Sequence, residues 1–158
     1  MSHLTFFTYE GFGSKALESH AYNQAVRMDN QIWISGQDQI FFPAHRHSHT
    51  LILLSGGWDR QTTELSPDIT TQIDQAFDNV DFVLKDAGGK GWEQVAVVRS
   101  YHVDLSDKAQ EAMVRNFRRW LPDHKALWTA VGVKKLGDER MLVEIEVVAH
   151  DSVKKYHV

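Results

Sequence analysis

Three histidines alternate with other residues in His45-Arg46-His47-Ser48-His49. In an extended strand, residues two apart project to the same side, so the three imidazoles could converge on one zinc ion. The competing interpretation is a polar surface turn that happens to be rich in histidine, because no neighbouring residue would obviously orient the rings. The pattern by itself does not establish a metal site, and we expect neither a metal nor another cofactor.

A second pattern involves carboxylates. Glu144 and Glu146 alternate with aliphatic residues, which predicts a strand with both glutamates on one face. One interpretation is that both glutamate side chains face solvent. The other is that a carboxylate at the buried edge of a subunit interface acts as a general base.

The composition excludes several classes of function. The 158 residues include no cysteine, which rules out disulfides, thiolate metal sites and a cysteine nucleophile. The net charge of −4 disfavours binding along an extended phosphate backbone. The apolar runs fall short of the ~20 residues that span a bilayer, and the first residues do not resemble a secretion signal. We therefore expect a soluble protein in the cytoplasm, with a mitochondrial location left open.

Periodicity predicts the elements that must position these residues. Residues 22–36 suit a hairpin that turns at Asp29-Asn30, since both residues tolerate positive φ. Apolar residues recur at helical spacing over residues 67–87. Ser66-Pro67 is typical of a helix start, and Gly88-Gly89 is typical of a helix end.

The second half of the chain continues this alternation. Residues 95–103 predict a buried strand, Ser106 predicts the cap of a helix that ends before Pro122, and residues 127–133 and 141–149 predict two closing strands. Helices separated by strands indicate one α+β domain over residues 1–158, with both helices on one face of the sheet. The other face of the sheet must also be shielded from water, and a second subunit is what usually shields it.

Four segments carry a resemblance to a known family. They are His20–Val26 with its Tyr22, the turn Ile34-Ser35-Gly36-Gln37, the helix Gln72–Gly88, and the final signature Thr129–Val133 followed by Val143–Ala149. In this order they resemble the RidA/YjgF family, also called the endoribonuclease L-PSP family. The resemblance covers about residues 20–150, apart from one insertion.

The resemblance implies a chorismate-mutase-like α+β fold and a homotrimer, in which the sheets form a central barrel and three clefts lie between subunits. The resemblance implies hydrolysis of a reactive enamine or imine to a keto acid and ammonia, without a cofactor. By the matching positions, Tyr22 and Glu144 would be catalytic, and Ser35 and Gly36 would bind substrate. Such chemistry needs orientation and a polarised water more than a strong nucleophile.

The chain departs from the family at the substrate clamp. Where family members usually have an arginine that holds the substrate carboxylate, this chain has Trp128, and where they often have a cysteine it has Ala130. An indole cannot form a bidentate ion pair with a carboxylate. We therefore expect Trp128 and Ala130 to line a cleft with an altered substrate range, with Arg99 or Lys125 as possible substitute cations.

An insertion over about residues 38–55 is the second departure. Its apolar ends flank the histidine-rich middle, so it could be an added hairpin over the cleft or translated intron sequence. We expect the domain to fold without it.

Three functions remain open on this evidence. The first is a homotrimeric hydrolase of an enamine, an imine or a related small metabolite. The second is a non-catalytic member that binds a small molecule or a protein in the same cleft. The third, less favoured because of the net charge, is an endoribonuclease acting on single-stranded RNA. No membrane partner is expected.

Overall fold

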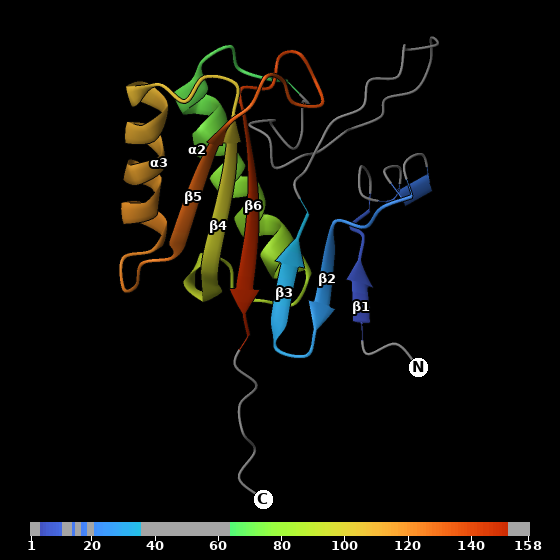
Figure 1. Cartoon of the computed structure of the whole chain (residues 1–158). Helices are drawn as coiled ribbons and strands as arrows, with labels where there is room; N and C mark the ends of the chain where they lie inside the picture. Colours follow the sequence, from blue (N-terminus) through green and yellow to red (C-terminus); the bar gives the residue numbers. More distant parts are fainter. Residues whose placement is uncertain (1–3, 11–13, 15–16, 19–20, 36–63, 152–158) are drawn as a thin grey trace, which may run out of the picture.

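The computed structural model describes residues 4–10, 14, 17–18, 21–35 and 64–151. Six strands of this part form one sheet in the order β1-β2-β3-β6-β4-β5 (Figure 1). The strands are β1 Leu4–Phe7, β2 Ala25–Met28, β3 Gln31–Ile34, β4 Val95–His102, β5 Leu127–Gly132 and β6 Val143–His150. Two helices, α2 Ile69–Asp86 and α3 Asp107–Trp120, and the 3-10 turn η1 Trp92–Gln94 complete the set.

The hairpin predicted at Asp29-Asn30 is confirmed. β2 and β3 pair antiparallel, and Asp29 takes a positive φ of 51° in the turn. Sequence patterning did not identify β1, which pairs antiparallel with β2 and places one end of the sheet next to the chain start.

The sheet is mixed, because β4 pairs parallel with β5 and antiparallel with β6. A parallel pair needs a crossover connection, and α3 supplies it between these two strands. β5 is therefore an edge strand that lies next to α3 (Figure 1).

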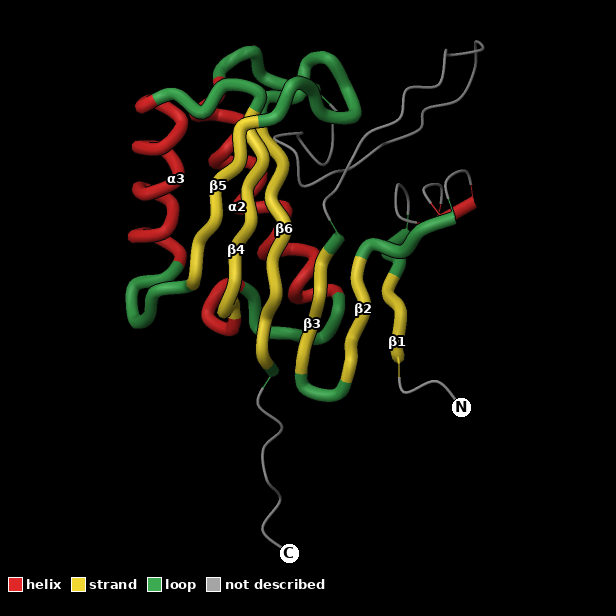
Figure 2. Tube along the Cα trace, in the orientation of Figure 1, coloured by secondary structure: helices red, strands yellow, loops and turns green. Residues whose placement is uncertain are grey.

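One face of the sheet packs against the helices. Figure 2 shows α2 crossing behind the sheet and α3 beside it. The rings of Phe77 on α2 and Phe117 on α3 meet edge to face at 5.4 Å, and Phe77 also stacks on Trp92 at 4.4 Å. Ile145 of β6 is fully buried in the same hydrophobic core. The predicted α+β arrangement, with both main helices on one face, is confirmed.

The other face, called the open face below, has no helix over it among the residues that the structure describes. It exposes large apolar side chains: Phe6 is 55% exposed, Leu127 is 73% exposed and Val131 is 40% exposed. Phe6 lies on β1 and the other two on β5, so the exposed apolar side chains stand at both edges of this face. Exposed apolar surface is typical of an association site.

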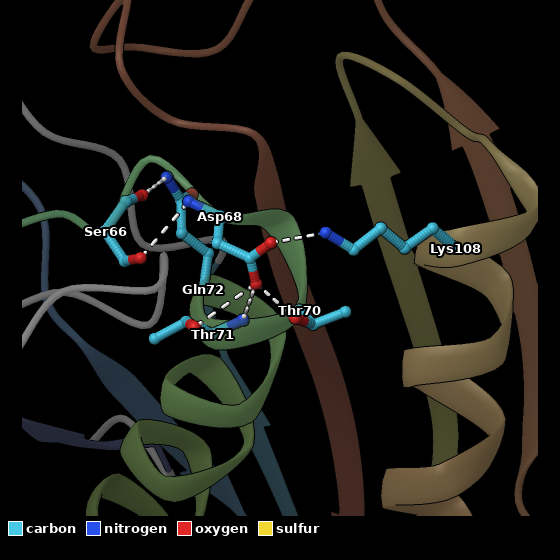
Figure 3. A network of polar contacts seen from close by, with 6 residues as sticks. All are labelled: Ser66, Asp68, Thr70, Thr71, Gln72 and Lys108. Carbon is cyan, nitrogen blue, oxygen red and sulfur yellow. Dashed lines mark hydrogen bonds and ion pairs between the residues drawn. The ribbon is translucent and has the colours of Figure 1, made fainter.

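The start of α2 differs from the prediction. The N-cap is Asp68 rather than Ser66, and its carboxylate accepts the backbone N–H of Thr71 at 3.0 Å (Figure 3). Lys108 of α3 pairs with the same carboxylate, and this contact, together with hydrogen bonds from the threonines, lowers the pKa of Asp68 far below its usual range. The network ties the two helices together at one end. Ser106 does occupy the N-cap of α3, but its side chain makes no capping hydrogen bond.

Candidate functional site

The two glutamates of β6 lie on the open face, as the alternation predicted, and the residues between them are buried. Strand pairing places Tyr101 of β4 opposite Glu144, and Arg99 opposite Glu146. Directly paired residues of neighbouring strands project to the same face. Four polar side chains therefore gather in the middle of the open face.

Glu146 is held by two of these neighbours. Arg99 Nη1 donates to Glu146 Oε1 at 2.7 Å, and the Tyr101 hydroxyl donates to Glu146 Oε2 at 3.2 Å. Burial, with the added effect of the nearby Glu146 carboxylate, raises the pKa of Tyr101, so the phenol remains a neutral donor. Both oxygens of Glu146 thus have protein partners.

A hollow of about 360 Å³ opens beside this cluster. Its lining brings together Tyr22 and Ser35, which were predicted as site residues, with Glu146, which was not. The remaining walls come from β1, β2, β3 and the segment before β2. They are Phe6, Ala21, Asn23, Ala25, Val26, Trp33 and Ile34.

Ser35 sits at this hollow because it directly follows β3. Its hydroxyl lies 3.4 Å from the backbone oxygens of Asn23 and Gln24, and its own N–H donates to the Gln24 oxygen at 3.2 Å. These contacts fix the end of β3 against the start of β2. Gly36, also predicted to bind substrate, lies outside the described residues.

Trp128 and Ala130 lie on the opposite face of the sheet. Ala130 pairs with Ser100, a fully buried residue on the helix-covered face. The Trp128 ring meets Phe117 of α3 edge to face at 5.1 Å, and Trp128 Nε1–H donates to Ser100 Oγ at 2.9 Å. The indole is therefore half-buried between the edge strand and α3.

Within one chain the predicted site residues thus form two groups. Tyr22, Ser35 and Glu144 belong to the open face or its hollow, and Trp128 and Ala130 belong to the helix-covered face. A cleft that contains both groups must draw them from two different chains.

The two candidate substitute cations already have partners. Arg99 is on the open face with Glu146, away from Trp128. Lys125 Nζ donates to the backbone oxygens of Leu121 and Pro122 after α3, at 3.1 and 3.4 Å. Neither side chain reaches the indole as a carboxylate clamp.

Other sequence-based hypotheses fall outside the described residues. His45, His47 and His49 lie there, as does the insertion at 38–55. In the described part of the chain, no group of three or more histidines or acidic residues is arranged to hold a metal ion. That same part contains no helix with both the length and the apolar character needed to cross a membrane.

Comparison with known proteins decides the family. The family model described as endoribonuclease L-PSP matches residues 13–151, which is most of the chain. The chain belongs to the RidA/YjgF family. The identification made from the four sequence segments is thereby confirmed. No curated protein matches the chain significantly.

Solved structures support the same RidA/YjgF fold. Protein YjgH is 25% identical, with a TM-score of 0.70 over 97% of this chain and 100% of that one. RidA from the Antarctic bacterium Psychrobacter sp. PAMC 21119 is 28% identical, with a TM-score of 0.63 over 82% of this chain and 87% of that one. E. coli TdcF, solved with bound serine, is 21% identical, with a TM-score of 0.64 over 83% and 88% of the two chains.

Sequence reasoning missed two features of this RidA/YjgF chain. One is the contact of Glu146 with Arg99 and Tyr101, which only the register between β4 and β6 could show. The other is the buried pair Ser100 and His102, whose alternation on β4 was the available signal. Both were overlooked because the segment was interpreted simply as a buried strand.

Proposed function

We propose that the protein is a homotrimeric hydrolase of imines or enamines, with its reaction cleft between subunits. The observation that carries this proposal is the position of Glu144 on the open face, in the same cluster as Glu146, which lines the hollow with Tyr22 and Ser35. Family membership supports the reaction class, because the resemblance implies imine hydrolysis for the matching residues.

The reaction needs no oxidant or cofactor. A water molecule adds to the imine carbon, the carbon–oxygen bond forms, and the carbon–nitrogen bond then breaks to leave a carbonyl compound and ammonia. Glu144 would accept a proton from the attacking water and return it to the departing nitrogen. Arg99 and Tyr101 hold the two oxygens of Glu146, which gives this carboxylate a structural role on the open face.

Two features support the trimer. The open face exposes Phe6, Leu127 and Val131, and a second copy of the chain would cover them. In addition, Trp128 and Glu144 lie on opposite faces of one sheet, so they can share a cleft only if they come from neighbouring subunits. Cyclic symmetry would produce three equal clefts.

The test is enzyme-dependent release of ammonia from imines generated in situ by an oxidase. We expect Glu144→Gln to lower the rate by about a hundredfold or more, the size of a lost general base. Glu146→Gln is the matched control and should retain more activity, because its carboxylate has a structural role. Wild-type protein that accelerates no imine, or equal loss in the two variants, would contradict the proposal.

A parallel assay with single-stranded RNA distinguishes imine hydrolysis from the ribonuclease activity that the family name states. The carboxylates of Glu144 and Glu146 on the open face disfavour a polyanion there. We expect no RNA cleavage that depends on Glu144. A non-catalytic binding protein would instead show saturable ligand binding without ammonia release.

A further inference from the structure

Three side chains form a hydrogen-bonded chain on the helix-covered face. Trp128 Nε1–H donates to Ser100 Oγ at 2.9 Å, and Ser100 Oγ lies 2.9 Å from His102 Nε2. Ser100 and His102 are completely buried on β4, whereas Trp128 is half-buried on the edge strand β5. These three hydrogen-bonded side chains therefore extend from the protein interior to the edge of the sheet.

The His102 imidazole is neutral in this position. Burial lowers the pKa of His102 to about 4, so the ring carries one N–H and one lone pair at neutral pH. Its Nδ1 atom is buried and has no hydrogen-bond partner among the described residues. A buried polar atom without a partner is uncommon and destabilising, so its retention requires a reason.

The other ring nitrogen, Nε2, is linked through Ser100 to the Trp128 indole. Ser100 can accept the indole N–H and donate its own proton to His102 Nε2, which uses the hydroxyl proton and one of its lone pairs and places the His102 proton on Nδ1. Phe117 contacts the ring from α3. Because its single N–H points inward to Ser100, the indole has only carbon atoms on the side that faces the edge of the sheet.

Neither Arg99 nor Lys125, the two cations considered as substitutes for the clamp, is directed at the indole. Arg99 is on the other face with Glu146, and Lys125 donates to backbone oxygens at the end of α3. A carboxylate brought beside the indole would lose its water without gaining a charged partner from Arg99 or Lys125.

We propose that Ser100 and His102 are positioning residues that fix Trp128 as a neutral wall of the cleft between subunits. The cleft then selects imines with an apolar substituent and without a carboxylate. This inference rests on the proposed function, since it names the substrate class of the same site.

A matched pair of substrates tests the class. An L-amino-acid oxidase converts leucine to an imine that carries a carboxylate, and a flavin amine oxidase converts isopentylamine to the corresponding imine without it. We expect wild-type protein to accelerate ammonia release from the neutral imine at least tenfold more strongly. Trp128→Arg should reverse this preference by about tenfold to a hundredfold, because it restores a charge-assisted pair.

A spectroscopic measurement tests the positioning independently of activity. The chain has five tryptophans, so the indole N–H signal of Trp128 can be assigned by its loss in Trp128→Phe. We expect Ser100→Ala to shift this signal and to speed its exchange with solvent at least tenfold, and Ser100→Thr to restore it. In wild-type protein the same signal should move as His102 titrates near pH 4.

The outcomes are distinguishable. A preference for the leucine-derived imine would overturn the substrate class while imine hydrolysis stands. Failure to accelerate either imine would overturn the proposed function and the substrate class with it, and the indole signal would then decide the positioning alone. An indole signal unchanged in Ser100→Ala would overturn the positioning. If Ser100→Ala does not fold, the pH titration of the wild-type signal decides the same point.

Discussion

Polar side chains on the two faces of the sheet differ in solvent exposure and in charge. On the open face, Arg99 and Glu146 form an ion pair with side chains that are 39% and 24% exposed. On the helix-covered face, Ser100 and His102 are fully buried and neutral. The same strand, β4, supplies residues to both arrangements at alternate positions.

Under the proposed function, this difference assigns the hydrolysis to the open face and the choice of substrate to the helix-covered face. A partly exposed carboxylate can exchange protons with water and reach a substrate, as hydrolysis requires. A buried, neutral hydrogen-bonded chain cannot reach a substrate, but it can hold a side chain such as Trp128 in one orientation. The predictions below test the two faces separately.

The largest expected effect concerns the proposed association of subunits through the open face. Leu127→Asp should convert the proposed trimer to monomer, because burying three leucine side chains contributes roughly 5–9 kcal/mol per trimer and a buried carboxylate adds a penalty. Sedimentation at micromolar concentration measures the change. Gln110→Asp on the exposed surface of α3 adds the same charge on the helix side and should leave the trimer intact. Unchanged mass in Leu127→Asp would show that no subunit covers this part of the face.

The next effect concerns the helix-covered face and pH. The folded-state pKa of His102, about 4, lies below its ordinary value of 6.5, so the unfolded chain takes up the proton first. The free energy of unfolding should therefore fall as the pH drops from 6.5 to 4, by about 3 kcal/mol from this residue, and His102 should add no further loss below pH 4.

Denaturant unfolding at fixed protein concentration checks this value. His102→Val removes the titrating group, so the difference between wild type and variant isolates its contribution from those of the carboxylates. A difference that does not vary between pH 6.5 and 4 would mean that His102 is accessible to water in the fold.

Much of the fold could be predicted from local patterns. Alternation placed both glutamates of β6 on one face, and Asp29-Asn30 marked the hairpin, because side-chain period and turn chemistry are local properties. The cap of α2 was misplaced by two residues, since Ser66 and Asp68 are both good caps, and the contact of Asp68 with Lys108 of α3 is not visible in the local sequence.

The site was less predictable, because it depends on strand register. The sequence suggested that Trp128 replaces a clamp near Glu144. It could not show that the parallel pairing of β4 with β5 puts Trp128 and Glu144 on opposite faces. A one-residue difference in register moves every side chain of a strand to the other face, and no local pattern determines that choice between distant strands.

The smallest expected effect is the coupling between Arg99 and Glu146. Partly exposed ion pairs typically contribute about 0.2–1 kcal/mol, so a double-mutant cycle with Arg99→Gln and Glu146→Gln in the Leu127→Asp background should give a coupling near 0.5 kcal/mol. Added salt should reduce it further. In the proposed wild-type trimer the coupling should be larger and less sensitive to salt, because a partner that covers the open face would remove water from the pair. Equal coupling in the two backgrounds would show that the partner leaves Arg99 and Glu146 exposed, and the difference between the two faces would then persist in the assembled protein.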